Sequence, residues 1–156
     1  MPGTGPVAPK KSQLRIASLV ATGALVSAVL VLLFRGELLG KGPAGLIAQG
    51  AAALLMVWAR LTFGMRSFHA GANPTEGGLV TTGPYRFVRH PIYSAILLFV
   101  WAGALSYVSI VSIVARVLAT AAIAVRIASE ERLLLERYPE YAAYAARTRR
   151  VVPFVV

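Results

Sequence analysis

Residues 91–128 read PIYSAILLFVWAGALSYVSIVSIVARVLATAAIAVRIA, and Arg116 and Arg126 are the only charged residues among them. One straight helix of this length would measure about 57 Å, nearly twice the hydrocarbon core of a bilayer. Two shorter helices in a tight hairpin fit a bilayer better. Dividing the stretch in this way predicts the turn near Ser106–Ser109, where no strong turn residue marks its position.

Two further apolar runs precede this stretch. Ile16–Phe34 carries no charge over 19 residues, and as a helix it spans roughly 28 Å, which is enough to cross the hydrocarbon core. Ala44–Ala59 continues as a second apolar helix that extends to about Phe63, and the short polar turn Arg35–Pro43 separates the two. The sequence therefore predicts an all-α integral membrane protein with about four transmembrane helices, the last two forming the tight hairpin.

The composition agrees with a membrane protein of one domain. Hydrophobic residues make up 57% of the 156 residues, the mean hydropathy is +0.68 and only 14% of residues are charged, which is outside the usual soluble mixture. The chain has no cysteine and no aspartate, so disulfides and thiolate metal sites are excluded. Neither a phosphate-binding P-loop nor a GxGxxG turn occurs, so the sequence lacks a Rossmann-type cofactor domain.

The positive charges are distributed unevenly along the chain. The net charge is +10, and thirteen of the 16 Lys and Arg residues lie in the N-terminal tail, the central loop and the C-terminal segment. Two others, Arg35 and Lys41, lie in the loop between the first two apolar runs. This is the positive-inside pattern of a membrane protein rather than the basic patch of a nucleic-acid-binding protein. Both termini and the central loop are therefore expected on the cytoplasmic side.

The chain divides into three parts. Residues 1–13 are rich in Gly and Pro and are expected to be disordered, and residues 14–64 carry the first two transmembrane helices. Residues 65–156 carry the central loop, the hairpin and a C-terminal segment whose tyrosines and arginines favour a position at the membrane interface. A polar connection as long as Gly64–Arg89 is usually functional in a compact protein.

Residues 83–93, GPYRFVRHPIY, form a polar and aromatic cluster at the mouth of the third apolar helix. Pro91 suits the first position of a helix and leaves His90 as the cap, with Tyr93 within one turn of it. The free N–H groups and the positive dipole end of such a helix make a site for a carboxylate or phosphate. The alternative, a capped helix start with an aromatic belt, has equal weight on these residues alone.

Arg126 and Glu130 are four residues apart, on one face of the fourth helix near its cytoplasmic end. The Arg-before-Glu order stabilises a helix only weakly, so an ion pair within the helix is a poor sole reason for them. The guanidinium can clamp a carboxylate, and the carboxylate can meet a cation or a ribose hydroxyl. A snorkelling arginine with a solvated glutamate is the alternative. Arg116 lies deeper, and both a functional intramembrane charge and a position at the far interface stay open for it.

Several of these stretches resemble one family. Leu79–Tyr85 (LVTTGPY), Arg89–Tyr93 (RHPIY) and Arg126–Glu131 (RIASEE) resemble motifs of membrane methyltransferases related to isoprenylcysteine carboxyl methyltransferase and the phospholipid methyltransferases. The tail, YPEYAAY at 138–144 followed by VPF at 152–154, is similar to the usual C-terminus of this family. The resemblance covers residues 69–154, and the first two helices match only in being hydrophobic.

The resemblance implies an enzyme that uses S-adenosylmethionine (SAM) and releases S-adenosylhomocysteine, with residues 65–156 as its catalytic region. The cofactor would lie in a cytoplasmic pocket formed by the central loop and the C-terminal segment. Arg126 would hold the substrate carboxylate, with Glu130 as the second catalytic residue and no metal ion. The residues that would line the cofactor are Gly77, Gly78, Leu79, Val80, Tyr85, His90, Pro91, Ile92, Tyr93 and Glu130. At Gly77–Gly78 the eukaryotic enzymes carry a bulkier polar pair, which puts side-chain contacts there in doubt.

The expected reaction is methyl transfer from SAM to a carboxylate, or a thiol, of a hydrophobic substrate that partitions into the membrane. A carboxylate is ionised at pH 7, so the enzyme has to align it and exclude water rather than supply a strong base. The alternatives are a phospholipid N-methyltransferase, which shares the His-Pro and Glu-Glu elements, and a non-enzymatic membrane scaffold or transporter subunit. A sterol-type NADPH reductase needs more membrane spans than 156 residues allow.

The expected partners are the lipid bilayer and a lipophilic small-molecule or lipid-modified substrate, with no nucleic acid and no metal. The expected location is a prokaryotic inner (cell) membrane, with both termini and the active site on the cytoplasmic side.

Overall fold

The computed structural model describes residues 11–64 and 78–152, and its regular elements are all helices. In this part of the chain there are five α-helices, two short 3-10 helices and no strand. They are α1 (Lys11–Phe34), α2 (Pro43–Phe63), η2 (Gly83–Arg86), α3 (Pro91–Ala102), η3 (Gly103–Leu105), α4 (Ile110–Arg137) and α5 (Tyr141–Arg147). The all-α prediction is confirmed.

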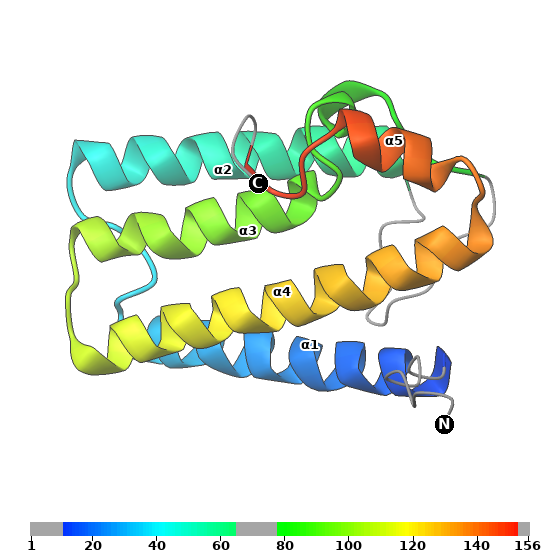
Figure 1. Cartoon of the computed structure of the whole chain (residues 1–156). Helices are drawn as coiled ribbons and strands as arrows, with labels where there is room; N and C mark the ends of the chain where they lie inside the picture. Colours follow the sequence, from blue (N-terminus) through cyan, green and yellow to red (C-terminus); the bar gives the residue numbers. More distant parts are fainter. Residues whose placement is uncertain (1–10, 65–77, 153–156) are drawn as a thin grey trace.

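The four longer helices pack as two antiparallel pairs. α1 runs along α4 and α2 runs along α3, while α3 and α4 are joined by a short turn (Figure 1). The buried core at the joined end is formed by Ala28, Leu32, Leu38, Val100, Ala115 and Ala119. The predicted tight turn between the last two long helices is confirmed. However, α3 packs mainly on α2 and α4 packs mainly on α1.

Three helices, α1, α2 and α4, are long and apolar enough to cross a membrane, and Pro91–Leu105 forms a shorter apolar helix. This confirms the predicted architecture, with the third helix shorter than a full span. α3 itself has 12 residues, or about 18 Å. α2 and α4 extend beyond the start of α3 on the side where the N-terminus and α5 lie (Figure 1). The start of α3 therefore lies alongside α2 and α4 rather than level with their ends (Figure 1).

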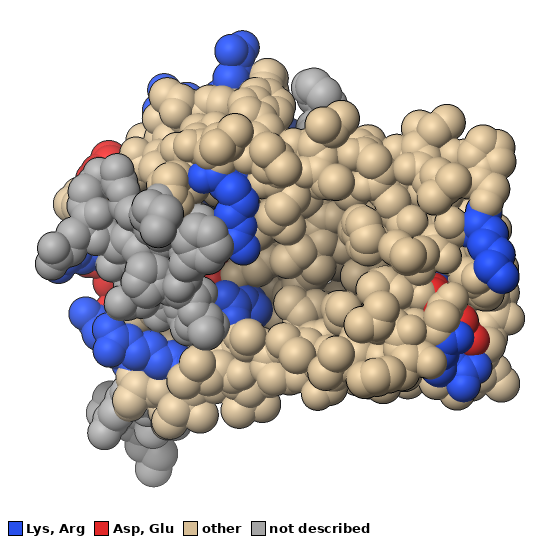
Figure 2. Space-filling view, turned by 180° about the vertical axis from the view of Figure 1, so that it is seen from behind, with Lys and Arg blue, Asp and Glu red and all other residues tan. Residues whose placement is uncertain are grey.

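The surface has the pattern expected of an integral membrane protein. On the face shown in Figure 2, Lys, Arg and Glu side chains gather toward the two ends, and the uncharged middle is hollowed. Large apolar side chains point outward, such as Ile47 (72% exposed) and Leu54 (74% exposed) on α2. Such a surface is unfavourable in water, and the hydrocarbon chains of lipids are its natural solvent.

The turn between α3 and α4 lies where the sequence predicts it. Ser109 is the N-cap of α4, and it forms a reciprocal capping box with Ser112 through two hydrogen bonds of 3.1 Å. Gly103 in η3 allows the loop between α1 and α2 to approach closely. A Cβ at Gly103 would lie 2.7 Å from the carbonyl oxygen of Leu38 and 2.9 Å from Nη2 of Arg116.

Arg116 is completely buried and ties three segments of the joined end together. Its Nε donates to the carbonyl of Val100 at 3.0 Å, and its Nη2 donates to the carbonyl of Glu37 at 2.8 Å. Hydrogen bonds to backbone carbonyls offset the cost of a charge in an apolar interior. The side chain does reach the loop at the far end, but it is buried there and connects this loop to α3 and α4.

The N-terminal helix starts earlier than the sequence predicts. Lys11–Gln13, expected in the disordered tail, form the first turn of α1. Nζ of Lys11 lies 3.2 Å from Oε2 of Glu136, and Leu14 packs with Leu133, so contacts with the end of α4 extend this helix. Residues 1–10 lie outside the described part of the chain.

The C-terminal tyrosines are buried, although the sequence favoured an interfacial position for them. Tyr141 and Tyr144 are 2% and 7% exposed. The hydroxyl of Tyr144 donates to the carbonyl of Tyr85 at 2.7 Å, which fixes α5 against η2. The tail thus packs on the protein itself, because its aromatic side chains find partners in the loop before α3.

Candidate active site

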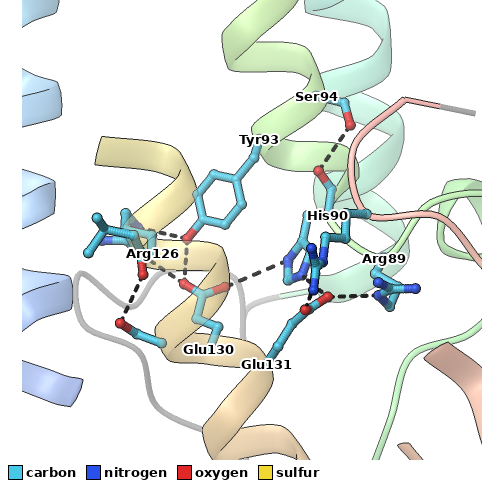
Figure 3. Close-up of polar contacts among 10 residues, drawn as sticks. Arg89, His90, Tyr93, Ser94, Arg126, Glu130 and Glu131 are labelled. Atoms are coloured by element: carbon cyan, nitrogen blue, oxygen red, sulfur yellow. Dashed lines mark hydrogen bonds and ion pairs between the residues drawn. The ribbon is translucent and has the colours of Figure 1, made fainter. Parts of the chain in front are cut away.

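The C-terminal half of α4 brings three charged residues, Arg126, Glu130 and Glu131, beside His90 and Tyr93 at the start of α3 (Figure 3). Arg126 and Glu130 share a face because they are about one helical turn apart. Nη2 of Arg126 lies 3.3 Å from Oε1 of Glu130. The cluster therefore forms where the short α3 meets the long α4.

Tyr93 joins the arginine to the glutamate across the two helices. Its hydroxyl accepts a hydrogen bond from Nε of Arg126 at 2.7 Å and donates one to Oε1 of Glu130. The guanidinium carbon also lies 5.5 Å from the centroid of the Tyr93 ring, within the range of a cation–π contact. Arg126 and Tyr93 are 6% and 8% exposed, so these polar contacts are made in a setting of low dielectric that strengthens them.

A third helix reaches the same guanidinium. Nη1 of Arg126 donates to the hydroxyl of Thr22, which lies near the middle of α1. The side chain of Arg126 is thus held by residues of α1, α3 and α4. A side chain with partners on three helices has one defined position rather than many.

His90 is the N-cap residue of α3, as the sequence predicts, but its side chain does not cap the helix. The ring faces the two carboxylates of α4. Nδ1 lies 3.8 Å from Oε2 of Glu130, and Nε2 lies 3.4 Å from Oε1 of Glu131. His90 is 7% exposed, and Nε2 has no hydrogen-bond partner among the described residues. A ligand that supplies such a partner gains free energy, because an unsatisfied buried nitrogen is costly.

The two neighbouring carboxylates differ in their surroundings. Glu131 accepts from Nε of Arg89 at 2.8 Å and from Nε of Arg150 at 3.0 Å. Its side chain is 11% exposed, against 22% for Glu130. Glu131 therefore belongs to an ion-pair network that joins α4 to the segments on either side, and Glu130 is the carboxylate that is more accessible to a ligand.

The C-terminal segment pairs with the residues just before α3. The backbone N–H groups of Arg89 and His90 donate to the carbonyls of Arg149 and Arg150 at 2.7 and 3.0 Å. The guanidinium of Arg89 donates further to the carbonyl of Thr148. This pairing places the C-terminal segment beside His90, so it forms one wall of the cluster.

Three tyrosines beneath this wall act as neutral packing residues. Burial raises the pKa of Tyr144 to about 12, and burial also raises the pKa of Tyr85 and of Tyr141 above the usual value. The negative charge of Glu131 raises the pKa of Tyr141 further. All three phenols are therefore protonated at physiological pH, and none of them is suited to act as a base there.

Other residues expected at the cofactor lie next to this cluster. Pro91 and Ile92 form the first turn of α3. Tyr85 is buried in η2, and its ring centroid lies 5.5 Å from that of Phe63 on α2. The structure thus brings the residues of the RHPIY stretch and those of the end of α4 into one place.

The glycine-rich part of the expected cofactor site is described only in part. Leu79 and Val80 are half-buried, and Gly78 is exposed with a φ of +82° that favours glycine. Gly77 lies outside the described residues.

Comparison with known proteins places this arrangement in a family. A family model described as phospholipid methyltransferase matches residues 42–141, which run from the start of α2 to the start of α5 and include His90, Arg126 and Glu130. The chain belongs to the phospholipid methyltransferase family. The family resemblance predicted from the motifs is confirmed. No curated protein and no solved structure matches the chain.

For four residues of the cluster in this phospholipid methyltransferase family member, the sequence alone predicted no role. Arg89 and Glu131 stood inside the recognised motifs, and their position next to His90 and Glu130 was the available signal. Arg150 belonged to a run of basic residues with no feature to distinguish it. The fourth is Thr22, one of three hydroxyl residues in the apolar run Ile16–Phe34, which lies outside the matched range and carries no sequence signal for a site.

Proposed function

We propose that this membrane methyltransferase uses SAM to methylate a carboxylate, or a thiol, of a hydrophobic acceptor that partitions into the bilayer. The observation that carries the proposal is the buried guanidinium of Arg126, which is held from three helices and lies beside the accessible carboxylate of Glu130. A fixed guanidinium in an apolar setting is a strong and selective partner for a carboxylate.

The chemistry of the residues around His90 fits SAM. The cofactor carries an ammonium, a carboxylate and ribose hydroxyls. The cluster offers the carboxylate of Glu130, the N-terminus of α3 and a buried ring nitrogen of His90 that has no hydrogen-bond partner in the described part of the chain. The residues that would hold SAM are Gly78, Leu79, Val80, Tyr85, His90, Pro91, Ile92, Tyr93 and Glu130, together with Gly77 outside the described part. When bound, SAM supplies an electrophilic methyl group on a sulfonium.

Arg126 would act on the acceptor. A carboxylic acid is ionised at neutral pH, so no proton has to be removed before its oxygen attacks the methyl group. The guanidinium would orient this oxygen, and the surrounding helices would keep water away from it, which leaves the oxygen more reactive. The uncharged, hollowed middle of the face in Figure 2 is suited to a hydrophobic acceptor that arrives from the bilayer.

N-methylation of a phospholipid is the second candidate, because the matching family model carries the description phospholipid methyltransferase. An amine acceptor would pair with a carboxylate rather than with a guanidinium, and Glu130 is the accessible one. The amine would also have to lose a proton before it attacks. A carboxylate acceptor would therefore bind Arg126, whereas an amine acceptor would bind Glu130.

The stability of the newly formed methyl bond in base distinguishes these two candidates. The purified full-length protein in lipid vesicles is incubated with methyl-labelled SAM and either S-farnesyl-N-acetylcysteine, a lipophilic carboxylic acid, or phosphatidylethanolamine, and the product is treated with base. A base-labile label on the first acceptor indicates a methyl ester and supports the proposal. A base-stable label on phosphatidylethanolamine supports N-methylation. No transfer to either acceptor, together with no binding of SAM, would contradict both.

A further inference from the structure

Thr22 is a polar residue within the apolar run of α1, and its hydroxyl contacts both its own helix and Arg126 of α4. It lies six residues after Ile16, the first residue of the uncharged run, which corresponds to about 9 Å along the helix axis. α1 lies entirely outside residues 42–141, the range that the family model matches. A role for Thr22 would therefore be a property of this chain and not of the matched family region.

The direction of the Thr22 hydroxyl is fixed by its neighbours. Its Oγ1 donates to the carbonyl of Ser18 at 2.8 Å. A hydroxyl has one proton, so with this proton committed to the backbone the oxygen presents its lone pairs as an acceptor. Nη1 of Arg126 donates to that oxygen. The contact is therefore specific for a hydroxyl and could not be replaced by a methyl group of the same size.

Without this contact, the charge of Arg126 would be drawn toward water. Long cationic side chains near a membrane boundary extend their charged ends toward the aqueous phase. Arg126 also has Glu130 one turn further toward the end of α4, at 3.3 Å from Nη2. Thr22, on the neighbouring α1, accepts from the other terminal nitrogen, Nη1. The hydroxyl thus holds the guanidinium against a movement toward the carboxylate and the water beyond it.

We propose that Thr22 is a positioning residue that fixes the Arg126 guanidinium for binding the oxygen of the methyl acceptor. This proposal rests on the proposed function, in which Arg126 binds the acceptor. It assigns α1 a part in acceptor recognition, in addition to its packing along α4. The alternative is that the hydrogen bond only holds the two helices together.

Steady-state kinetics separate these two roles. The full-length protein in lipid vesicles is assayed with labelled SAM and S-farnesyl-N-acetylcysteine as wild type, Thr22→Val and Thr22→Ser. Valine keeps the shape and loses the acceptor, so the KM for the acceptor should rise about tenfold while the Kd of SAM stays unchanged. Serine keeps the hydroxyl and should restore the wild-type KM. Ser27→Ala, an exposed hydroxyl of the same helix, should leave both constants unchanged.

Two results would overturn the proposal. One is a KM for the acceptor in Thr22→Val that equals that of the wild type, and the other is a Thr22→Ser variant as impaired as Thr22→Val. Either result would leave the proposed function intact, because wild-type transfer would still be observed. A wild type that binds no SAM and methylates no acceptor would instead remove the proposed function, and this proposal with it.

A double-mutant cycle tests the contact without turnover. The melting temperatures of Thr22→Val, Arg126→Gln and the double variant are measured in the same vesicles. The two substitutions should be non-additive, since the second has no hydrogen bond left to remove. Additive shifts would show that the two side chains act independently and would contradict a positioning role.

Discussion

At the scale of single residues, the proposed function divides the cluster into side chains that would face a ligand and side chains that hold the protein together. Glu131 lies between Arg89 and Arg150 and is largely buried, so its charge is used within the fold. Glu130 is its neighbour in the sequence, yet it is twice as exposed. Arg126 is buried and has neutral partners, Tyr93 and Thr22, besides the carboxylate. The partners of each side chain, rather than its residue type, thus distinguish the residues that we propose to face a ligand.

Arg126 and His90 should affect different ligands. Replacing Arg126 by Ala removes the proposed acceptor-binding guanidinium, so kcat/KM for the acceptor should fall about a hundredfold while the Kd of SAM changes little. Replacing His90 by Ala removes a ring beside the proposed cofactor site, so the Kd of SAM should rise about tenfold. Calorimetry with SAM and initial rates with the acceptor measure the two effects.

A matched control is available on the same helix. Arg132 is exposed on α4, and Arg132→Ala should change neither constant. The opposite pattern, in which Arg126→Ala weakens SAM binding and His90→Ala affects only the acceptor, would contradict the assigned roles.

At the scale of elements, short polar contacts decide how the helices meet. The C-terminal segment is held beside α3 by backbone pairing and by Arg89, whose guanidinium also reaches the carbonyl of Ala145 at 2.8 Å. At the other end, Arg116 and Gly103 bring the loop between α1 and α2 against η3. These contacts are few, and each therefore has a large effect on the element that it fixes.

Arg89→Ala should release the C-terminal segment. The substitution leaves the buried carboxylate of Glu131 with one arginine fewer, and breaking a buried ion pair costs about 3–5 kcal/mol. The free energy of unfolding should fall, and limited proteolysis should cleave the segment after α4 more rapidly. Arg147→Ala is the control, because Arg147 is exposed and donates only within its own helix, to the carbonyl of Ala143. Equal protease resistance of the two variants would refute this account of the segment.

Gly103→Ala should destabilise the turn between α3 and α4. The added Cβ would lie 2.7 Å from the carbonyl oxygen of Leu38, and neither backbone can yield easily, so we expect a loss of about 1–3 kcal/mol. Gly50→Ala is the control, since no atom lies within 4 Å of a Cβ at Gly50 in α2. This second variant should be neutral or more stable, because alanine favours a helix. Thermal unfolding in detergent compares the two, and a more stable Gly103→Ala would disprove the close approach.

At the scale of the whole molecule, two helix pairs place the polar cluster at one end of an otherwise apolar body. The cluster lies at the start of α3, which is shorter than its neighbours α2 and α4 (Figure 1). Among the described residues, the basic residues at the start of α1 and in the C-terminal segment lie at the same end as the cluster, and the loop with Arg35 and Lys41 lies at the other (Figure 1). By the positive-inside rule, we expect the cluster to face the cytoplasm.

Single cysteines can test this orientation, because the chain has none of its own. Lys41→Cys should react in intact cells with a maleimide that does not cross the membrane. Arg147→Cys should react only after the membrane is permeabilised. Both positions are exposed on the protein surface, so a difference in labelling reports the side of the membrane on which each one lies. The reverse pattern of labelling would place the cluster on the outer side and contradict the predicted topology.

The sequence by itself determined the helices, the membrane class, the turn and the family. Long uncharged runs in lipid have one solution, a hydrogen-bonded helix, so Ile16–Phe34 and Ala44–Phe63 could be delimited within a few residues. His90-Pro91 marked the start of α3 for an equally local reason, since proline suits the first turn and the residue before it becomes the cap. The RHPIY and RIASEE motifs likewise named most of the side chains that meet in the cluster.

Only the tertiary structure decided which helices pair and which side chains those pairs bring together. Lipid tails are as apolar as the helix faces, so hydrophobicity does not reveal that α1 lies along α4 and α2 along α3. The partners of Arg116, the roles of Glu131 and Arg89, and the contact between Thr22 and Arg126 all depend on that pairing. The last of these joins residues 104 positions apart, a separation that no local pattern records.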